Sequence, residues 1–142
     1  MAGEGKRAEL LDRTVKNYHA AIYWGDAKRA SAFVSKDVRN SFVRDVTARS
    51  SSERLVEVKI EGIHLEEEAK KATVNCRVKF FRVPQNVVNT RLEKENWVFD
   101  VHEGGWINKG IEEVESFEHF EDIVSDETNS LTDKDFRARL AE

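Results

Sequence analysis

The chain has 142 residues, a length typical of one domain built around one hydrophobic core. Hydrophobic residues make up 39% and charged residues 35%, which excludes a disordered or membrane-spanning chain and favours a soluble globular one. The net charge of −4 divides into +4 over residues 1–54, zero over 55–110 and −8 over 111–142. Because the small basic surplus is spread over predicted helices, nucleic-acid binding is disfavoured.

Three helices are predicted in the first third of the chain. Over residues 8–24, apolar side chains recur at helical spacing at Leu11, Val15, Tyr18 and Ile22. Gly25 can end this helix in the left-handed conformation, and Asp26 can cap a second, short helix. A third helix is expected after Ser35 and should end in the serine run at 50–52.

Strands follow, because the apolar period changes from 3.6 to 2. The first strand carries Val56, Val58 and Ile60 on one face, and its phase slips at Gly62, as a β-bulge requires. A second strand has Val74, Cys76, Val78 and Phe80 on one face. A third is expected over about 87–101, and the Gly104-Gly105 turn leads into a last short strand at Trp106-Ile107.

This order predicts the α+β class: a cone of three N-terminal helices packed on a strongly bent antiparallel sheet of about four strands. Residues 1–110 would form the domain, and residues 111–142 an acidic helical extension packed on it or appended to it. Residues 111–127 hold eight acids and no Lys or Arg, interleaved with apolar residues that include Phe117 and Phe120. Either this segment is a helix with a solvated acidic face, or it docks a basic protein partner.

Three stretches carry a resemblance to a known superfamily. They are the run from Tyr18 to Asp26, the long strands bent at Gly62 and near Phe81, and the run from Trp97 to Ile107. Together they resemble the nuclear-transport-factor-2-like superfamily, also called cystatin-like or ketosteroid-isomerase-like. The resemblance implies the cone fold but no single function, since members include isomerases, dehydratases, cyclases, transport adaptors and domains without known activity.

A narrower resemblance bears on location. The Trp24-Gly25-Asp26 and Ala32-Phe33-Val34 runs are similar to uncharacterised bacterial envelope proteins of this fold, often lipoproteins. It implies a cell-envelope protein whose leader has been removed, with a cytoplasmic protein as the alternative, because residues 1–6 form no signal peptide as they stand. No apolar run approaches the roughly 20 residues needed to cross a bilayer.

Candidate site residues divide into two groups. The candidates for lining a ligand pocket are Tyr18, His19, Cys76, Trp97 and Trp106, although core packing is the favoured role of all of them except His19. The candidates for an interaction surface are Trp24, Phe117 and Phe120. The acids Glu57, Glu61, Glu93 and Glu95 are assigned to the opposite face of the sheet or to turns, which argues against catalysis.

We expect neither a metal nor another cofactor. The four histidines, at 19, 64, 102 and 119, lack the i,i+3 or i,i+4 spacing of a helical metal pair. With Cys76 as the single cysteine, we expect no internal disulfide and no zinc site based on cysteine.

Two functions remain open. The first is a non-catalytic module that binds a small apolar ligand in the cone, or a protein on the sheet or tail. The mixed charges Lys59, Arg77 and Lys79 beside acids on the outer face favour a monomer or a weak homodimer. The alternative is an isomerase- or dehydratase-like enzyme that uses Tyr18 or His19 with an acid not yet placed. A buried carboxylate or histidine in the cavity, with a hydrogen-bond donor within reach, would favour the enzyme.

Overall fold

A computed structural model describes residues 2–66 and 68–117. The helical part comprises α1 (Ala2–Tyr23), α2 (Ala27–Ala30), the 3-10 turns η1 (Ser31–Phe33) and η2 (Lys36–Val38), and α3 (Arg39–Ser50). The strands are β1 (Glu53–Glu66), β2 (Lys71–Arg82), β3 (Asn89–Asp100) and β4 (Gly105–Val114). Helices followed by an antiparallel sheet confirm the α+β class.

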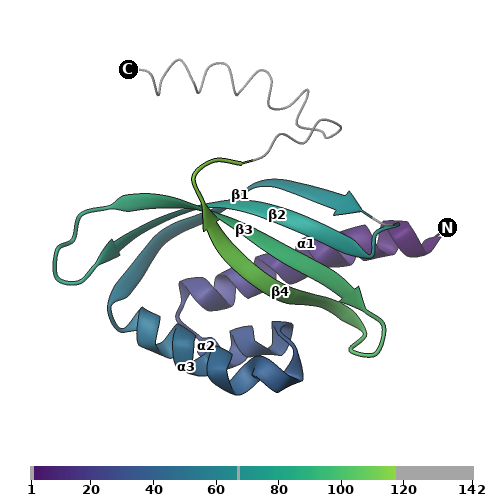
Figure 1. Cartoon of the computed structure of the whole chain (residues 1–142), viewed down its shortest axis with the longest axis horizontal. Coiled ribbons are helices and arrows are strands. Elements are labelled where there is room, and N and C mark those ends of the chain that lie inside the picture. The colour runs from purple at the N-terminus through teal and green to yellow at the C-terminus, as the bar shows by residue number, and fades with distance from the viewer. Residues whose placement is uncertain (1, 67, 118–142) are drawn as a thin grey trace, which may run out of the picture.

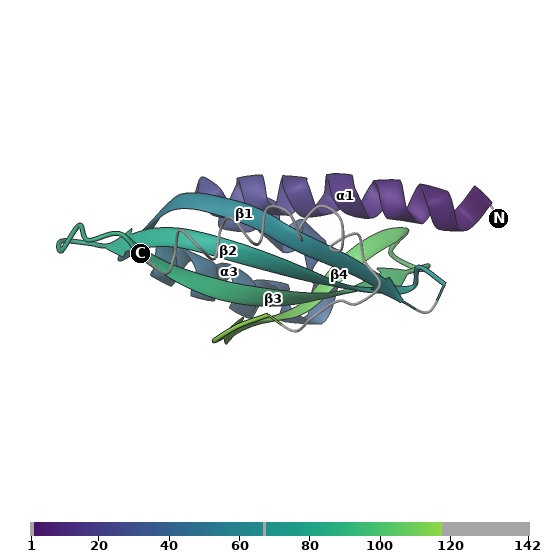
Figure 2. The same cartoon turned by 90° about the horizontal axis from the view of Figure 1, so that it is seen from above.

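The sheet has the order β1-β2-β3-β4, and each strand is antiparallel to its neighbours. The sheet is long and curved, and α1, α2 and α3 all lie on one side of it (Figure 1). Viewed from above, α1 runs along the edge formed by β1 (Figure 2). The curvature and the one-sided helices produce the cone expected from the sequence.

The N-terminal helices follow the sequence pattern closely. Leu11, Val15 and Tyr18 are buried, so the apolar stripe of α1 faces the sheet as predicted. Gly25 has φ +70°, a conformation in which a residue with a Cβ is strained. The Asp26 side chain accepts a hydrogen bond from the backbone N–H of Arg29 at 3.1 Å, and it therefore caps α2.

Two register shifts bend β1 against β2. One lies between Ile60 and Gly62, and it confirms the predicted bulge. The other, between Leu55 and Glu57, was not expected from the sequence. Because of it, Leu55 packs against the core with Val58 and Ile60 while Val56 is 42% exposed, so the prediction that Val56 shares a face with Val58 and Ile60 is wrong.

The last strand is longer than the sequence indicated. It continues past Ile107 to Val114, which pairs with Leu92 of β3. The helical extension therefore does not begin at Ile111: pairing along β3 outweighs the helix propensity of this Glu-rich segment, and a domain boundary at 110 would cut β4. Residues 118–142, including Phe120, lie outside the described residues, and so does the rest of the predicted acidic helix.

The core lies between α1 and the inner face of the sheet. As predicted, the alternating side chains of β2 face it, and all of them are buried: Val74, Cys76, Val78 and Phe80. Trp97 and Trp106 complete it from β3 and β4. In the described part of the chain, the helices are too short or too polar to span a membrane.

Candidate functional site

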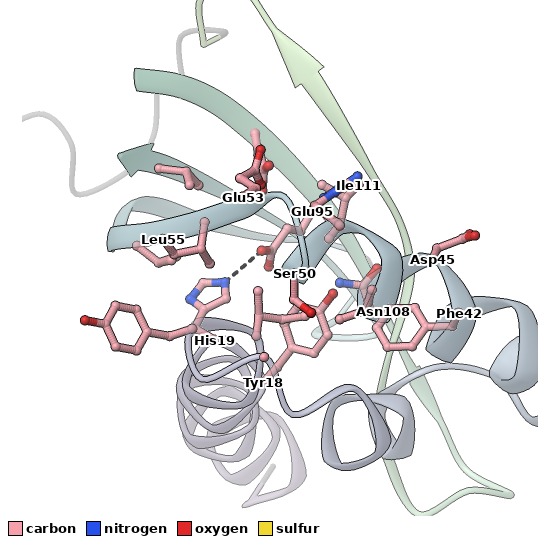
Figure 3. A pocket seen from close by; sticks show the side chains of 18 of the residues that line it. Tyr18, His19, Phe42, Asp45, Ser50, Glu53, Leu55, Glu95, Asn108 and Ile111 are labelled. Atoms are coloured by element: carbon pink, nitrogen blue, oxygen red, sulfur yellow. Dashed lines mark hydrogen bonds and ion pairs between the residues drawn. The ribbon is translucent and has the colours of Figure 1, made fainter. Parts of the chain in front are cut away.

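A cavity of about 770 Å³ lies between the helices and the inner face of the sheet. This volume falls within the range of about 300–1,000 Å³ that is usual for small-molecule sites. Its apolar wall comes from both layers and includes Ile22, Val34, Phe42, Leu55, Val58 and Val78. His19, Glu95 and Asn108 add polar groups to the same cavity (Figure 3).

One buried polar cluster joins α1 to β2 and β3 beside this cavity. His19 Nε2 and Glu95 Oε2 lie 2.7 Å apart, and the Trp97 indole donates a hydrogen bond of 2.9 Å to Glu95 Oε1. The Cys76 sulfur lies 3.6 Å from both His19 Nε2 and Glu95 Oε2. Glu95 is 2% exposed and His19 8%, so the cluster is shielded from water. Burial of charged groups costs desolvation free energy, and hydrogen bonds offset only part of that cost.

The place of Glu95 corrects the sequence prediction, which assigned Glu93 and Glu95 to the opposite face or to turns. Both line the cavity, and Glu93 lies directly opposite the inward-facing Cys76. The signal was available in the sequence. Positions 93 and 95 share the strand phase of Trp97 and Phe99, which alternate on one face. In this strand the alternation, and not the polarity of the side chain, determines which face a residue occupies.

Tyr18 and Cys76 are neutral groups in this site. Tyr18 is 2% exposed and packs edge-on against Trp97, with ring centroids 5.5 Å apart. Burial, with the negative charge of Glu95, raises the pKa of the Tyr18 hydroxyl beyond its usual range. Burial and Glu95 also raise the pKa of the Cys76 thiol, so this cysteine is not an activated nucleophile.

A second group of charges lines the cavity farther along β3. Arg91 donates hydrogen bonds to Glu53 at 2.7 and 3.0 Å and to Glu93 at 2.6 Å. Burial opposes ionisation of Glu53, but the hydrogen bonds and charge of Arg91 outweigh it and hold the pKa of Glu53 below its ordinary value. Burial also works against the charge of Arg91, and the two carboxylates nevertheless raise its pKa. These groups satisfy one another.

Asn108 offers a hydrogen-bond donor that the protein does not use. The residue is 6% exposed, and its Oδ1 accepts a hydrogen bond of 2.8 Å from the Gly110 backbone N–H. Its Nδ2 is buried and has no partner among the described residues. A buried polar group without a partner costs about 1–3 kcal/mol. Since Asn108 lines the cavity, a small shift of its covered amide would let an acceptor atom on a bound molecule satisfy it.

The other sequence candidates lie away from the cavity or at its rim. Trp97 and Trp106 are 1% and 2% exposed and pack the core, which is the role the sequence favoured for them. Trp24 is 77% exposed where it borders the cavity. Phe117 is half-buried at the end of the described residues, and Phe120 lies outside them.

His19, Cys76 and Glu95 could also hold a metal ion. One ligand atom from each lies within 4.8 Å of the others, and all three residues are buried. Sequence spacing could not suggest this group, because Cys76 is 57 positions from His19 and 19 positions from Glu95. Only the fold brings these residues together.

No protein-family model and no curated protein sequence matches the chain. Solved structures do match. A ketosteroid isomerase-like protein from Erwinia carotovora atroseptica has a TM-score of 0.59 and 11% identity, covering 76% of this chain and 96% of its own. An NTF2-like protein with a cystatin-like fold from Novosphingobium aromaticivorans has a TM-score of 0.55 and 16% identity, covering 76% and 80%.

A SEC-C motif containing protein from Rhodopseudomonas palustris is also similar, with a TM-score of 0.56 and 18% identity, covering 68% of this chain and 73% of its own. Identities this low establish the fold alone. The chain has the nuclear-transport-factor-2-like, or cystatin-like, fold, which confirms the resemblance seen in the sequence. The narrower resemblance to envelope lipoproteins stays a prediction.

Proposed function

We propose that this protein binds a small organic molecule in the cavity of the cone. One observation carries the proposal: Asn108, which lines a cavity of about 770 Å³, has a buried Nδ2 donor without a partner among residues 2–66 and 68–117. A ligand that supplies an acceptor there removes a cost of about 1–3 kcal/mol from the folded protein.

The lining of the cavity defines the ligand chemistry. Phe42, Leu55 and Val58 offer apolar surface, which suits a cyclic or aromatic body. The charges of Arg91, Glu53 and Glu93 are already paired, so they demand no ionic group from the ligand. An apolar body that carries one carbonyl oxygen fits these residues. The lining also includes further charged residues: Asp45, Arg49, Arg54, Arg82, Lys109 and Glu113.

A matched pair of probes tests the proposal. 2-Acetylnaphthalene carries a carbonyl acceptor, and 2-ethylnaphthalene has nearly the same shape without it. We expect the ketone to bind about 10-fold more tightly, the value of one hydrogen bond of about 1.4 kcal/mol. Isothermal titration calorimetry measures both affinities, first with the unaltered chain and then with the variant Asn108→Leu, in which the difference should vanish.

The control for this experiment is Asn89→Leu. Asn89 is exposed, and its Nδ2 donates to the Val87 carbonyl oxygen, away from the cavity lining. This variant should keep the full preference for the ketone. Equal binding of both probes by the unaltered chain, or a preference that survives Asn108→Leu, would contradict the proposal.

A second candidate function is acid–base catalysis, and the pair of His19 and Glu95 favours it. If His19 donates its Nε2–H to Glu95, the lone pair of the ring lies on Nδ1 and can accept a proton. Asn108 Nδ2 could then donate to the enolate oxygen of a ketone from which His19 has removed an α-proton.

Hydrogen exchange separates catalysis from binding. In D2O, the methyl protons of 2-acetylnaphthalene exchange through the enolate, and the protein should accelerate this exchange if His19 acts as a base. His19→Gln should return the rate to that of buffer while the ketone still binds. Exchange in the presence of the unaltered chain that is no faster than in buffer would leave binding without catalysis.

A further inference from the structure

We infer that His19, Cys76 and Glu95 form a binding site for a divalent transition-metal ion, Zn²⁺ in the first place, with one coordination position open toward the cavity. The three side chains offer three different kinds of ligand atom: an imidazole nitrogen, a sulfur and a carboxylate oxygen. These atoms all lie within 4.8 Å of one another.

The fold holds the three groups in place without help from a flexible loop. His19 lies on α1, Cys76 on β2 and Glu95 on β3. In the register of the sheet, Cys76 is opposite Glu93, so Cys76 and Glu95 are diagonal neighbours on one face of two paired strands. Sites built on helices and strands are held more rigidly than sites on loops.

The distances fit tetrahedral coordination with one small adjustment. Zinc bonds of about 2.0–2.3 Å at tetrahedral angles place sulfur about 3.6 Å from the nitrogen and oxygen ligands, and those two about 3.3 Å apart. Here Cys76 Sγ is 3.6 Å from both His19 Nε2 and Glu95 Oε2. The 2.7 Å separation of His19 and Glu95 is a hydrogen bond, which a metal would replace by opening it about 0.6 Å.

The ligand types select the metal. Thiolate and imidazole favour zinc and its transition-metal neighbours over magnesium and calcium, which prefer oxygen alone. On metal binding the Cys76 thiol releases its proton to solvent, and the resulting thiolate and the carboxylate together carry two negative charges, so a divalent ion makes the site neutral. Neutralisation matters here because all three residues are buried and an unbalanced charge would be costly.

The surroundings complete the site. The Trp97 indole donates to Glu95 Oε1, which orients the carboxylate and leaves Oε2 toward His19 and Cys76. Such supporting hydrogen bonds usually accompany metal-binding carboxylates. His19 and Glu95 also line the cavity, so a fourth ligand can come from there. Three protein ligands and one open position are the pattern of zinc sites that accept an outside molecule.

This site goes beyond the proposed ligand binding and does not depend on it. It also competes with the acid–base role, because a metal on His19 Nε2 and Glu95 Oε2 removes the hydrogen bond between them. Cys76 distinguishes the two uses of the cluster. A proton-transfer pair needs no thiol, whereas the metal site loses one of its three ligands without it.

Cobalt is the probe for the test, because a Co²⁺–thiolate bond has a charge-transfer absorption that zinc lacks. The full chain, reduced and freed of metal by a chelator, should take up one equivalent of Co²⁺ with this absorption, and Zn²⁺ should abolish it. Cys76→Ser should remove the absorption, and Glu95→Gln should weaken Co²⁺ binding at least 10-fold. Trp97→Phe should weaken binding about 10–100-fold while the charge-transfer absorption remains at saturation.

The matched control is His102→Gln, which removes an exposed imidazole at the turn between β3 and β4 and should change nothing. Circular dichroism checks that each variant is folded. If Cys76→Ser does not fold, Trp97→Phe is the variant that tests the site. The inference is overturned if the unaltered chain shows no Co²⁺–thiolate absorption, or if Glu95→Gln and Trp97→Phe both bind Co²⁺ as it does. Titration of the metal-free chain with 2-acetylnaphthalene is a separate result, so the two proposals fail independently.

Discussion

The two faces of the sheet use the same kinds of charged residue in opposite surroundings. On the outer face, Arg77 pairs with Glu61 at 2.8 Å, with both side chains more than a quarter exposed, and the Lys79–Glu57 pair at 3.6 Å is about half exposed. On the inner face, the carboxylates of Glu95 and Glu53 are almost completely buried.

Neither kind of ion pair is expected to contribute much to the stability of the fold, but for different reasons. Exposed pairs such as those on the outer face contribute about 0–1 kcal/mol, and they keep the surface polar. Buried pairs often stabilise a protein no more than apolar side chains of similar volume, because desolvation offsets their attraction. Charges held on the inner face, where valine or leucine would pack, are therefore best explained by what they do in the cavity.

The largest effect should come from removing one partner of the buried pair. Glu95→Ala leaves His19, Cys76 and the Trp97 N–H without their shared acceptor, and it should lower the free energy of unfolding by about 3–5 kcal/mol. Glu61→Ala on the outer face is the control, with an expected loss below about 1 kcal/mol. Urea denaturation measures both variants. Similar losses would mean that the two faces are equivalent.

Arg91→Met should have the next largest effect, about 3 kcal/mol, because it removes the cation paired with Glu93 and leaves the buried Glu53 only its longer contact of 3.8 Å with Arg82. The pH dependence of stability should also differ between the intact protein and this variant. In the intact protein the pKa of Glu53 is below its ordinary 4.5, so its contribution to stability is full above pH 4.5 and is lost as the pH falls through the lower, folded-state pKa.

Without Arg91, the pKa of Glu53 should rise, because burial is then opposed only by the weaker effects of Arg49 and Arg82. A smaller depression of this pKa gives a smaller gain in stability as the pH rises. The stability that the intact protein gains between acid and neutral pH should therefore shrink in the variant. Urea denaturation at several pH values measures it, and parallel curves for the two proteins would contradict this account of Glu53.

Asn108→Leu should have the smallest effect on stability. It loses the hydrogen bond from Gly110 N–H, worth about 1 kcal/mol, but it also removes the unsatisfied Nδ2, which costs about 1–3 kcal/mol. The variant should therefore be as stable as the unaltered chain or slightly more stable, although it no longer prefers the ketone. Thermal denaturation measures it, and a loss above about 2 kcal/mol would make Asn108 a structural residue.

Much of the fold follows from periodicity, because burial of one face imposes a period of 3.6 on α1 and of 2 on β2. The left-handed end of α1 at Gly25 and the bulge at Gly62 could also be predicted, since both conformations favour glycine. The bulge at Leu55 carries no such marker. The length of β4 was missed because pairing with β3, which its own sequence does not reveal, determines it.

The candidate site was predictable in part. Strand phase alone places Glu95 on the inner face with Trp97, whatever its charge. Its contacts with His19 and Cys76 could not be predicted, because they depend on how α1 crosses the sheet and join residues far apart in the chain. The lack of a partner for Asn108 Nδ2 among the described residues could not be predicted either, since it depends on the folded surroundings.

One measurement tests the central claim most directly: the side-chain amide resonances of the asparagines in a ¹⁵N NMR spectrum during titration with 2-acetylnaphthalene. We predict that the NH2 resonances of Asn108 shift with saturation, while those of Asn89 stay in place because its Nδ2 donates to the Val87 carbonyl oxygen. Asn108 resonances that do not move, or shifts confined to the exposed indole of Trp24, would contradict the claim that the inner polar groups form a ligand site.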